Sequence, residues 1–228
     1  MGMESADIFA TKGLEYLIVI GFLVLFAAFW RILVGRAVET RPLVRRSGRF
    51  RVARGYHYHR GHSWAAPASR GRVRVGMDDF AQRLLGRVSG LVLPEVGSVV
   101  RQGDQGWTID VDGRQIRMLS PMDGAVEAVN PEVARDPGIV NADPYESGWL
   151  LEVRPRDARR CFKNLMDDRL ASLRAEQSSE WMTELYTSEL GVTLPDGGEP
   201  IEGFGRLLKE DGWERLAEHV FLSDDLPS

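Results

Sequence analysis

The hydrophobic pattern changes twice along the chain, and it begins with a long apolar run. From Tyr16 to Trp30 every residue is apolar or Gly, and the run resumes at 32–34 after Arg31. Because roughly 19 helical residues span about 30 Å of hydrocarbon, this stretch predicts a transmembrane helix. The aliphatic stem of Arg31 can carry its charge to the interface. Tyr16 and Trp30 are aromatic residues of the kind that lie at membrane surfaces.

Two other interpretations of this run fit the sequence less well. A cleaved signal peptide needs a basic start and a nearby small-residue cleavage site, but acidic residues outnumber the single Lys12 before the run. No such site follows closely. A buried core helix would keep a polar face, which this run lacks. We therefore interpret residues 1–35 as an uncleaved anchor.

Positive charge gathers directly after the apolar run and predicts its orientation. The arginines concerned are Arg31, Arg36, Arg41, Arg45, Arg46, Arg49, Arg51 and Arg54. The positive-inside rule places this side in the cytoplasm, so we expect a single-pass protein of the cell inner membrane with its N-terminus outside. The stretch 36–56 then reads as a basic linker along anionic lipid headgroups.

Between residues 57 and 156 the pattern changes to short apolar runs separated by Gly, Pro, Asn and Asp, which indicate strands and turns. Strands are expected at 72–76, 88–93, 106–111, 115–119, 124–129 and 150–153. A tight hairpin is expected at Asp112-Gly113. A short helix is expected with Asp78 or Met77 near its N-terminal cap and Gly86 at its end. Many short strands with little helix favour a small barrel or sandwich.

The C-terminal extension, 157–228, is acidic and returns to helical spacing. A long helix is expected to begin at Asp157, followed by a loop and a short final helix. The extension could simply pack on the strand region. However, it is too short to build a core of its own, and it carries the aromatic residues Phe204, Trp213 and Phe221. We expect these three side chains to bind neighbouring subunits.

Composition narrows the possible functions. The formal net charge of -4 argues against nucleic acid as a partner of the whole chain. The single cysteine, Cys161, excludes an internal disulfide and a cysteine-based metal site within one chain. Lysine is rare, because the sequence contains only Lys12, Lys163 and Lys209.

One cluster has metal-ligand side chains at close spacing. An extended backbone would put His57 and His59 on one face, with His62 shortly after them. No cysteine or carboxylate lies near enough in sequence to complete a tetrahedral site, so packing and contacts with phosphate groups beside the membrane explain these residues more simply. No phosphate loop or nucleophile elbow is present, and we expect no enzyme activity.

Several motifs occur in an order that is similar to one known family. They are His62-Ser63-Trp64, Val75-Gly76-Met77-Asp78-Asp79-Phe80-Ala81-Gln82, Leu93-Pro94-Glu95-Val96-Gly97, Ser120-Pro121-Met122-Asp123-Gly124 and Asn141-Ala142-Asp143-Pro144-Tyr145-Glu146-Ser147-Gly148-Trp149-Leu150. Together they resemble the H protein of the glycine cleavage system. The resemblance implies a mainly β barrel-sandwich hybrid of the lipoyl type, here with a single N-terminal transmembrane helix and a C-terminal helical extension.

The family's chemistry depends on a lipoyl lysine at a hairpin tip, and this sequence has no lysine there. Counting back from Gly124 without gaps puts Gly113 at the lysine position. Lipoate is attached to a lysine amine, and arginine cannot replace it because the guanidinium stays protonated. A shift of one residue does not restore the site, since no lysine occurs between Lys12 and Lys163. We therefore expect no covalent lipoate and no other cofactor.

Three hypotheses for function remain. The first is a non-catalytic scaffold subunit of a multisubunit membrane complex, with the lipid bilayer and other subunits as partners. By analogy, a respiratory or photosynthetic electron-transfer assembly is a complex of this kind. The second is a membrane adaptor that recruits a lipoate-dependent or one-carbon enzyme system. The third, a carrier with an unconventional attachment site, conflicts with the rarity of lysine.

Overall fold

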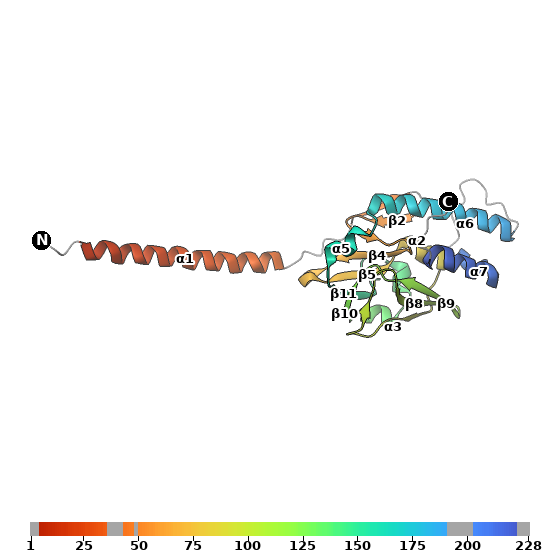
Figure 1. Cartoon of the computed structure of the whole chain (residues 1–228), viewed down its shortest axis with the longest axis horizontal. Coiled ribbons are helices and arrows are strands. Elements are labelled where there is room, and N and C mark those ends of the chain that lie inside the picture. Colours follow the sequence, from red (N-terminus) through yellow and green to blue (C-terminus); the bar gives the residue numbers. More distant parts are fainter. Residues whose placement is uncertain (1–4, 36–42, 48–49, 191–202, 223–228) are drawn as a thin grey trace. The chain divides into compact units, whose positions relative to one another are not determined.

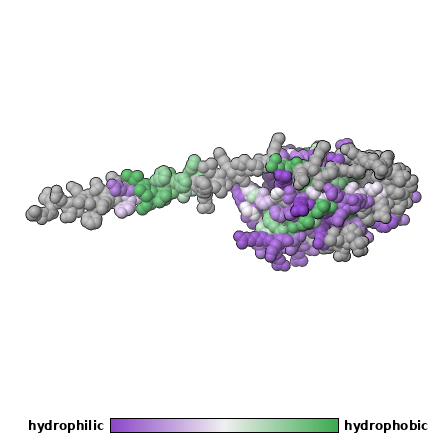
Figure 2. Space-filling model, turned by 90° about the horizontal axis from the view of Figure 1, so that it is seen from above, coloured by the Kyte–Doolittle hydropathy of each residue, from purple (hydrophilic) through white to green (hydrophobic). Residues whose placement is uncertain are grey.

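The computed structural model describes residues 5–35, 43–47, 50–190 and 203–222, and the chain forms two units divided after Glu39 (Figure 1). The first unit contains the helix α1 (Ser5–Gly35). The large apolar side chains described on α1 are 49–72% exposed, and Figure 2 shows them as a hydrophobic stretch. Among the described residues, no helix meets the length and apolarity needed to cross a membrane.

The residues expected at the membrane surface are described only in part. Tyr16 is 67% exposed. The side chains of Trp30 and Arg31, and the whole of Arg36, lie outside the described residues.

The second unit is built on two antiparallel sheets and a hairpin. The larger sheet has the order β3 (His57–Tyr58), β4 (Ser63–Pro67), β5 (Val73–Met77), β11 (Leu151–Pro155), β10 (Gly124–Val129), β7 (Val99–Val100). The smaller sheet has the order β6 (Gly90–Val92), β8 (Gln105–Val111), β9 (Arg114–Leu119). The strands expected from the alternating pattern are confirmed within one to two residues, whereas β3, β4 and β7 were not predicted.

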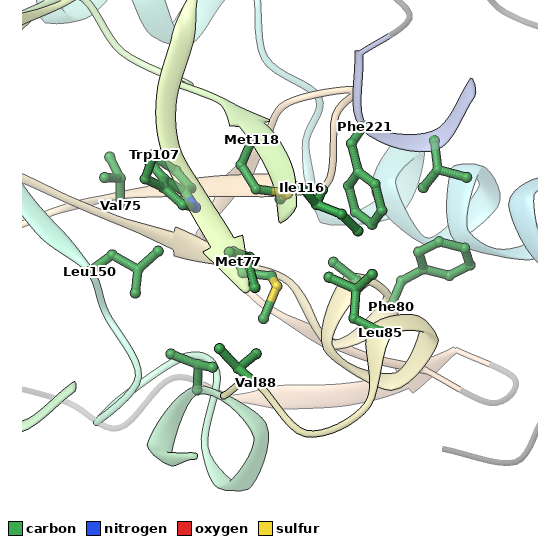
Figure 3. Packing of buried hydrophobic residues seen from close by; sticks show 14 of the residues in the cluster. Val75, Met77, Phe80, Leu85, Val88, Trp107, Ile116, Met118, Leu150 and Phe221 are labelled. Carbon is green, nitrogen blue, oxygen red and sulfur yellow. The ribbon is translucent and has the colours of Figure 1, made fainter. Parts of the chain in front are cut away.

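The core lies where the inner faces of these sheets meet. Alternate residues of β8 and β9 are buried, namely Trp107, Ile109, Val111, Ile116 and Met118. Figure 3 shows these strands meeting residues of β5, of the helix α2 (Asp79–Leu85), and Phe221. Each fully buried side chain of this size contributes about 1.5–3 kcal/mol of hydrophobic stabilisation.

The predicted short helix α2 is confirmed, and of the two candidates for its N-terminal cap the structure has Asp78. The Asp78 carboxylate accepts a hydrogen bond from the Ala81 N–H at 2.8 Å, which satisfies a donor in the first turn. Gly86 ends the helix with φ 75°, a conformation that glycine adopts without steric cost.

The linker predicted over 36–56 is corrected in its second half. Residues there form a hairpin of β1 (Val44–Ser47) and β2 (Phe50–Ala53). Phe50 and Val52 are each 4% exposed, because alternate positions of the strand face the core. Arg51 lies between them, and its Nε donates to the buried Asp79 carboxylate at 2.7 Å. Arg51 therefore stabilises the fold of the domain.

The long helix expected from Asp157 is two helices. Asp157 caps α5 (Ala158–Lys163), and α6 (Asp168–Leu190) follows after a break. At the break, the backbone N–H and C=O of Met166 both bond to Tyr58 at 2.8 Å, so the chain leaves helical geometry to pair with β3. The remaining short helices are η1 (Ser69–Gly71), α3 (Pro131–Arg135), α4 (Ile139–Ala142), η2 (Phe204–Leu207), α7 (Glu210–Leu216) and η3 (Ala217–Leu222).

Asp79 joins β2 to α2, and its removal should destabilise the domain. The carboxylate is fully buried and accepts hydrogen bonds from Arg51, Gln82 and Arg83. Asp79→Ala leaves these donors without their acceptor, so we expect a loss of about 2–3 kcal/mol in the free energy of unfolding. Chemical denaturation measures this. The exposed Glu95→Ala should stay within about 0.5 kcal/mol of the parent, and an equal effect of both variants would contradict the assignment.

Candidate functional site

The hairpin between β8 and β9 ends in a two-residue turn, as predicted. Val111 pairs with Arg114, and Asp112 and Gly113 between them have φ values of 54° and 85°. Positive φ at both positions is the geometry of a tight hairpin turn, in which glycine is favoured. The tip is further held by the Asp110 carboxylate, which accepts the Gly113 N–H at 2.9 Å.

The Asp110 carboxylate also accepts a hydrogen bond from the Ser89 hydroxyl at 2.7 Å. The bonds from Ser89 and Gly113 lower the pKa of Asp110. The turn is therefore tied to the residue before β6 as well as to its own strands.

The C-terminal segment, defined as Gly203–Leu222, begins beside α2. The Gly203 N–H donates to the Arg83 carbonyl at 2.8 Å. A Cβ on Gly86 would lie 2.5 Å from the Gly203 Cα, so the two backbones approach more closely than any larger residue allows. This close approach directs the C-terminal segment toward the hairpin.

Two arginines fasten the C-terminal segment to the hairpin. Arg206 donates to the Asp112 carboxylate at 2.7 Å, directly at the turn. On β9, Arg114 donates to the Leu208 carbonyl at 3.2 Å, and its guanidinium lies 5.2 Å from the centre of the Trp213 ring. The tip and the first residue of β9 therefore both contact the C-terminal segment.

The predicted partner-binding aromatics are mostly inside the domain, which corrects that prediction. Trp213 is 4% exposed and Phe221 is 0% exposed. The short tail does not build a core of its own, but it completes the core of the strand region, where Leu216 and Val220 are also buried. The side chain of Phe204 lies outside the described residues.

The three histidines proposed as weak metal ligands have different partners. His57 packs on Phe162 with ring centres 4.5 Å apart, and burial lowers its pKa. The Nδ1 atom of His59 accepts the Gly61 N–H at 3.1 Å. His62 Nδ1 lies 2.9 Å from the Asp78 carboxylate. Within the described ranges, no group of three or more His, Cys, Asp or Glu side chains is arranged to hold a metal ion.

The His-x-Trp motif has a structural use. The Trp64 Nε1 atom lies within hydrogen-bonding distance of the Met77 carbonyl at 2.9 Å and the Pro144 carbonyl at 3.1 Å. A Cβ on Gly76 would lie 2.6 Å from the Trp64 ring. The motifs that contain Trp64, Gly76-Met77 and Pro144 therefore meet at one buried indole ring, which explains why they occur together.

Two groups with possible acid, base or nucleophile chemistry are kept protonated. Burial, with a smaller effect of Glu146, raises the pKa of Tyr56 to about 12. Burial also raises the pKa of the Cys161 thiol, which is 1% exposed. A thiol is nucleophilic as its thiolate, so Cys161 is not activated in this environment.

The fold and its motifs agree with the comparison with known proteins. The model of the glycine cleavage H-protein family matches residues 56–178. The chain belongs to this family. The β8–β9 hairpin lies inside the match, whereas the C-terminal segment lies outside it. The surface that covers the hairpin is therefore an addition to the part that this chain shares with the H-protein family.

Individual relatives show the extent of the similarity. The probable glycine cleavage system H protein of Pyrococcus furiosus is 35% identical over 120 residues, which are 53% of this chain and 89% of that protein. The corresponding protein of Micrococcus luteus is 40% identical over 117 residues, 51% and 91% of the two chains. A crystal structure of the H protein from Mycobacterium marinum aligns with a TM-score of 0.47 and 29% identity, covering 55% of this chain and 97% of that one.

Arg114 and Arg117 provide a matched test of the hairpin contacts. Both lie on β9, but Arg117 is exposed whereas Arg114 contacts Leu208 and Trp213. We expect Arg114→Ala to lower the free energy of unfolding by about 1–2 kcal/mol through the lost hydrogen bond and cation–π contact. Arg117→Ala should change it by less than about 0.5 kcal/mol. Equal stabilities of the two variants would show that the contact contributes nothing.

Proposed function

We propose that this chain is a non-catalytic scaffold subunit of a membrane complex and that its H-protein-family domain acts as a binding domain without lipoate. The observation that carries the proposal is the tip of the β8–β9 hairpin. It consists of Asp112 and Gly113, with Asp112 paired to Arg206. A carrier function needs an acylated amine on a mobile arm, and this tip offers no amine.

The sequence supports the absence of lipoate independently of any alignment. No lysine occurs between Lys12 and Lys163, a range that contains both strands of the hairpin. The other cationic residues there are arginines and histidines, and a guanidinium does not form the amide that lipoate requires.

The C-terminal segment supports a binding role. It covers one face of the hairpin with its own buried side chains, including Trp213 and Leu216. A partner of this domain therefore meets a composite surface made of the H-protein part and the added segment. The addition favours partners different from those of a carrier protein.

The first unit supports attachment to a membrane. The described part of α1 exposes large apolar side chains, among them Leu17, Val24 and Phe29, and seven arginines follow α1 between residues 36 and 54. Apolar surface of this kind is stabilised by lipid, and the arginines other than Arg51, which binds Asp79, suit anionic headgroups on the cytoplasmic side. We place the H-protein-family domain at the cytoplasmic face of the inner membrane.

Intact-mass measurement tests the loss of lipoylation. We expect the chain produced in cells that lipoylate a co-expressed glycine cleavage H protein to have its unmodified mass, because its hairpin has no acceptor amine. The co-expressed H protein is the positive control and should gain the lipoyl mass. A lipoyl adduct on this chain would overturn the proposal.

Affinity purification of the full chain tests the scaffold role. We expect integral membrane subunits to co-purify after mild detergent extraction. By analogy, these subunits could belong to a respiratory or photosynthetic electron-transfer assembly. Glycine cleavage or dehydrogenase components in their place would favour the adaptor hypothesis, and a monodisperse free monomer would contradict both.

A further inference from the structure

A buried arginine on α6 has a side-chain nitrogen without a hydrogen-bond partner among the described residues. Arg174 is 6% exposed, and its Nε atom has no hydrogen-bond partner in the part of the chain that the structure describes. Burying a charged group without a partner costs several kcal/mol in general, so such a group is normally paired or bound to a ligand. A hydrogen-bond acceptor beside the Arg174 guanidinium would therefore stabilise the domain.

A second buried nitrogen lies in the same region. His62 is 2% exposed, and its Nε2 atom has no hydrogen-bond partner among the described residues. Its other ring nitrogen, Nδ1, lies 2.9 Å from the Asp78 carboxylate. The ring stacks on Phe80 at 4.2 Å, and Phe221 approaches it edge-on. The imidazole is thus fixed in place with one nitrogen unused.

Asp78 lies near both groups, but of the two it bonds only to His62 in the described part of the chain. It is the carboxylate whose charge acts on Arg174. One of its oxygens already accepts the Ala81 N–H at 2.8 Å, and the other bonds to His62. Arg174 therefore receives only a distant attraction from Asp78.

The surroundings of Arg174 are also rich in positive charge. Burial lowers the pKa of Arg174 most, and the like charge of Arg60 lowers it further, against a smaller opposing effect of Asp78. Burial and then the charge of Arg174 lower the pKa of His219. The β3–β4 connection, α6 and η3 thus bring basic side chains into one region near Asp78. An additional negative charge would stabilise this arrangement.

We infer that the region between Arg174 and His62 binds a small inorganic anion. The Arg174 guanidinium is the main donor, and His62 Nε2 is the second. An imidazolium donates from both ring nitrogens, so His62 can bond to Asp78 and to the anion at once. Chloride, sulfate and phosphate share the necessary chemistry, because each accepts N–H donors. The bound anion would join α6 and η3 to the core of the domain.

The test measures the thermal stability of the full chain against chloride, sulfate and phosphate. A bulky organic sulfonate keeps the ionic strength constant. A saturating anion concentration should raise the melting temperature by roughly 5–10 °C. The anion that reaches half of this rise at the lowest concentration is the preferred ligand. Arg174→Met should lose this rise and be at least as stable as the parent without anion, because it removes an uncompensated buried charge. Arg169→Met, at an exposed position of the same helix, should keep the rise.

Two outcomes would overturn the inference. An equal rise in the parent and in Arg174→Met would mean that the anions act through general exclusion from the protein surface. A constant destabilisation of Arg174→Met at every anion concentration would mean that Arg174 is a structural residue satisfied by water. If the variant fails to fold, the Arg174 Nε–H resonance of the parent decides: a saturable shift with anion supports the site, and an unchanged resonance refutes it.

Discussion

The packing of the C-terminal segment on the β8–β9 hairpin is the interaction on which the rest of the domain depends. β9 is the edge strand of a three-stranded sheet, and its buried side chains, Ile116 and Met118, need a cover. Residues of η3 provide that cover. Without it the sheet would expose apolar surface at an unpaired edge, an arrangement that promotes aggregation.

The hairpin tip takes part in this packing. It carries no lysine, and Asp112 is paired with Arg206 of the C-terminal segment. The same covering elements bring Phe221 over His62 and place His219 near Arg174. The closure of the domain and the position of Phe221 beside His62 therefore have a common origin in one added segment, whereas the missing lysine is a separate feature of the hairpin sequence.

Local patterns predicted the local structure well. The alternation of apolar residues located most strands, Asp78 and Gly86 marked the ends of α2, and Asp112-Gly113 marked the turn. Contacts between distant residues could not be found in this way. Arg206 and Asp112 are 94 positions apart, and their pairing has no signature in either neighbourhood. For the same reason the arginine excess near residue 51 suggested a linker, although Asp79 binds one of these arginines. Trp213 and Phe221 were recognised as unusual, but burial within the same chain explains them.

Native-state hydrogen exchange of the intact chain tests the central claim most directly. The amides of β9 and those of α7 and η3 can be followed separately as denaturant is increased. If the C-terminal segment and the hairpin form one cooperative unit, both sets should open with the same free energy and the same denaturant dependence. Rapid, denaturant-independent exchange in α7 and η3, with β9 still fully protected, would contradict the account.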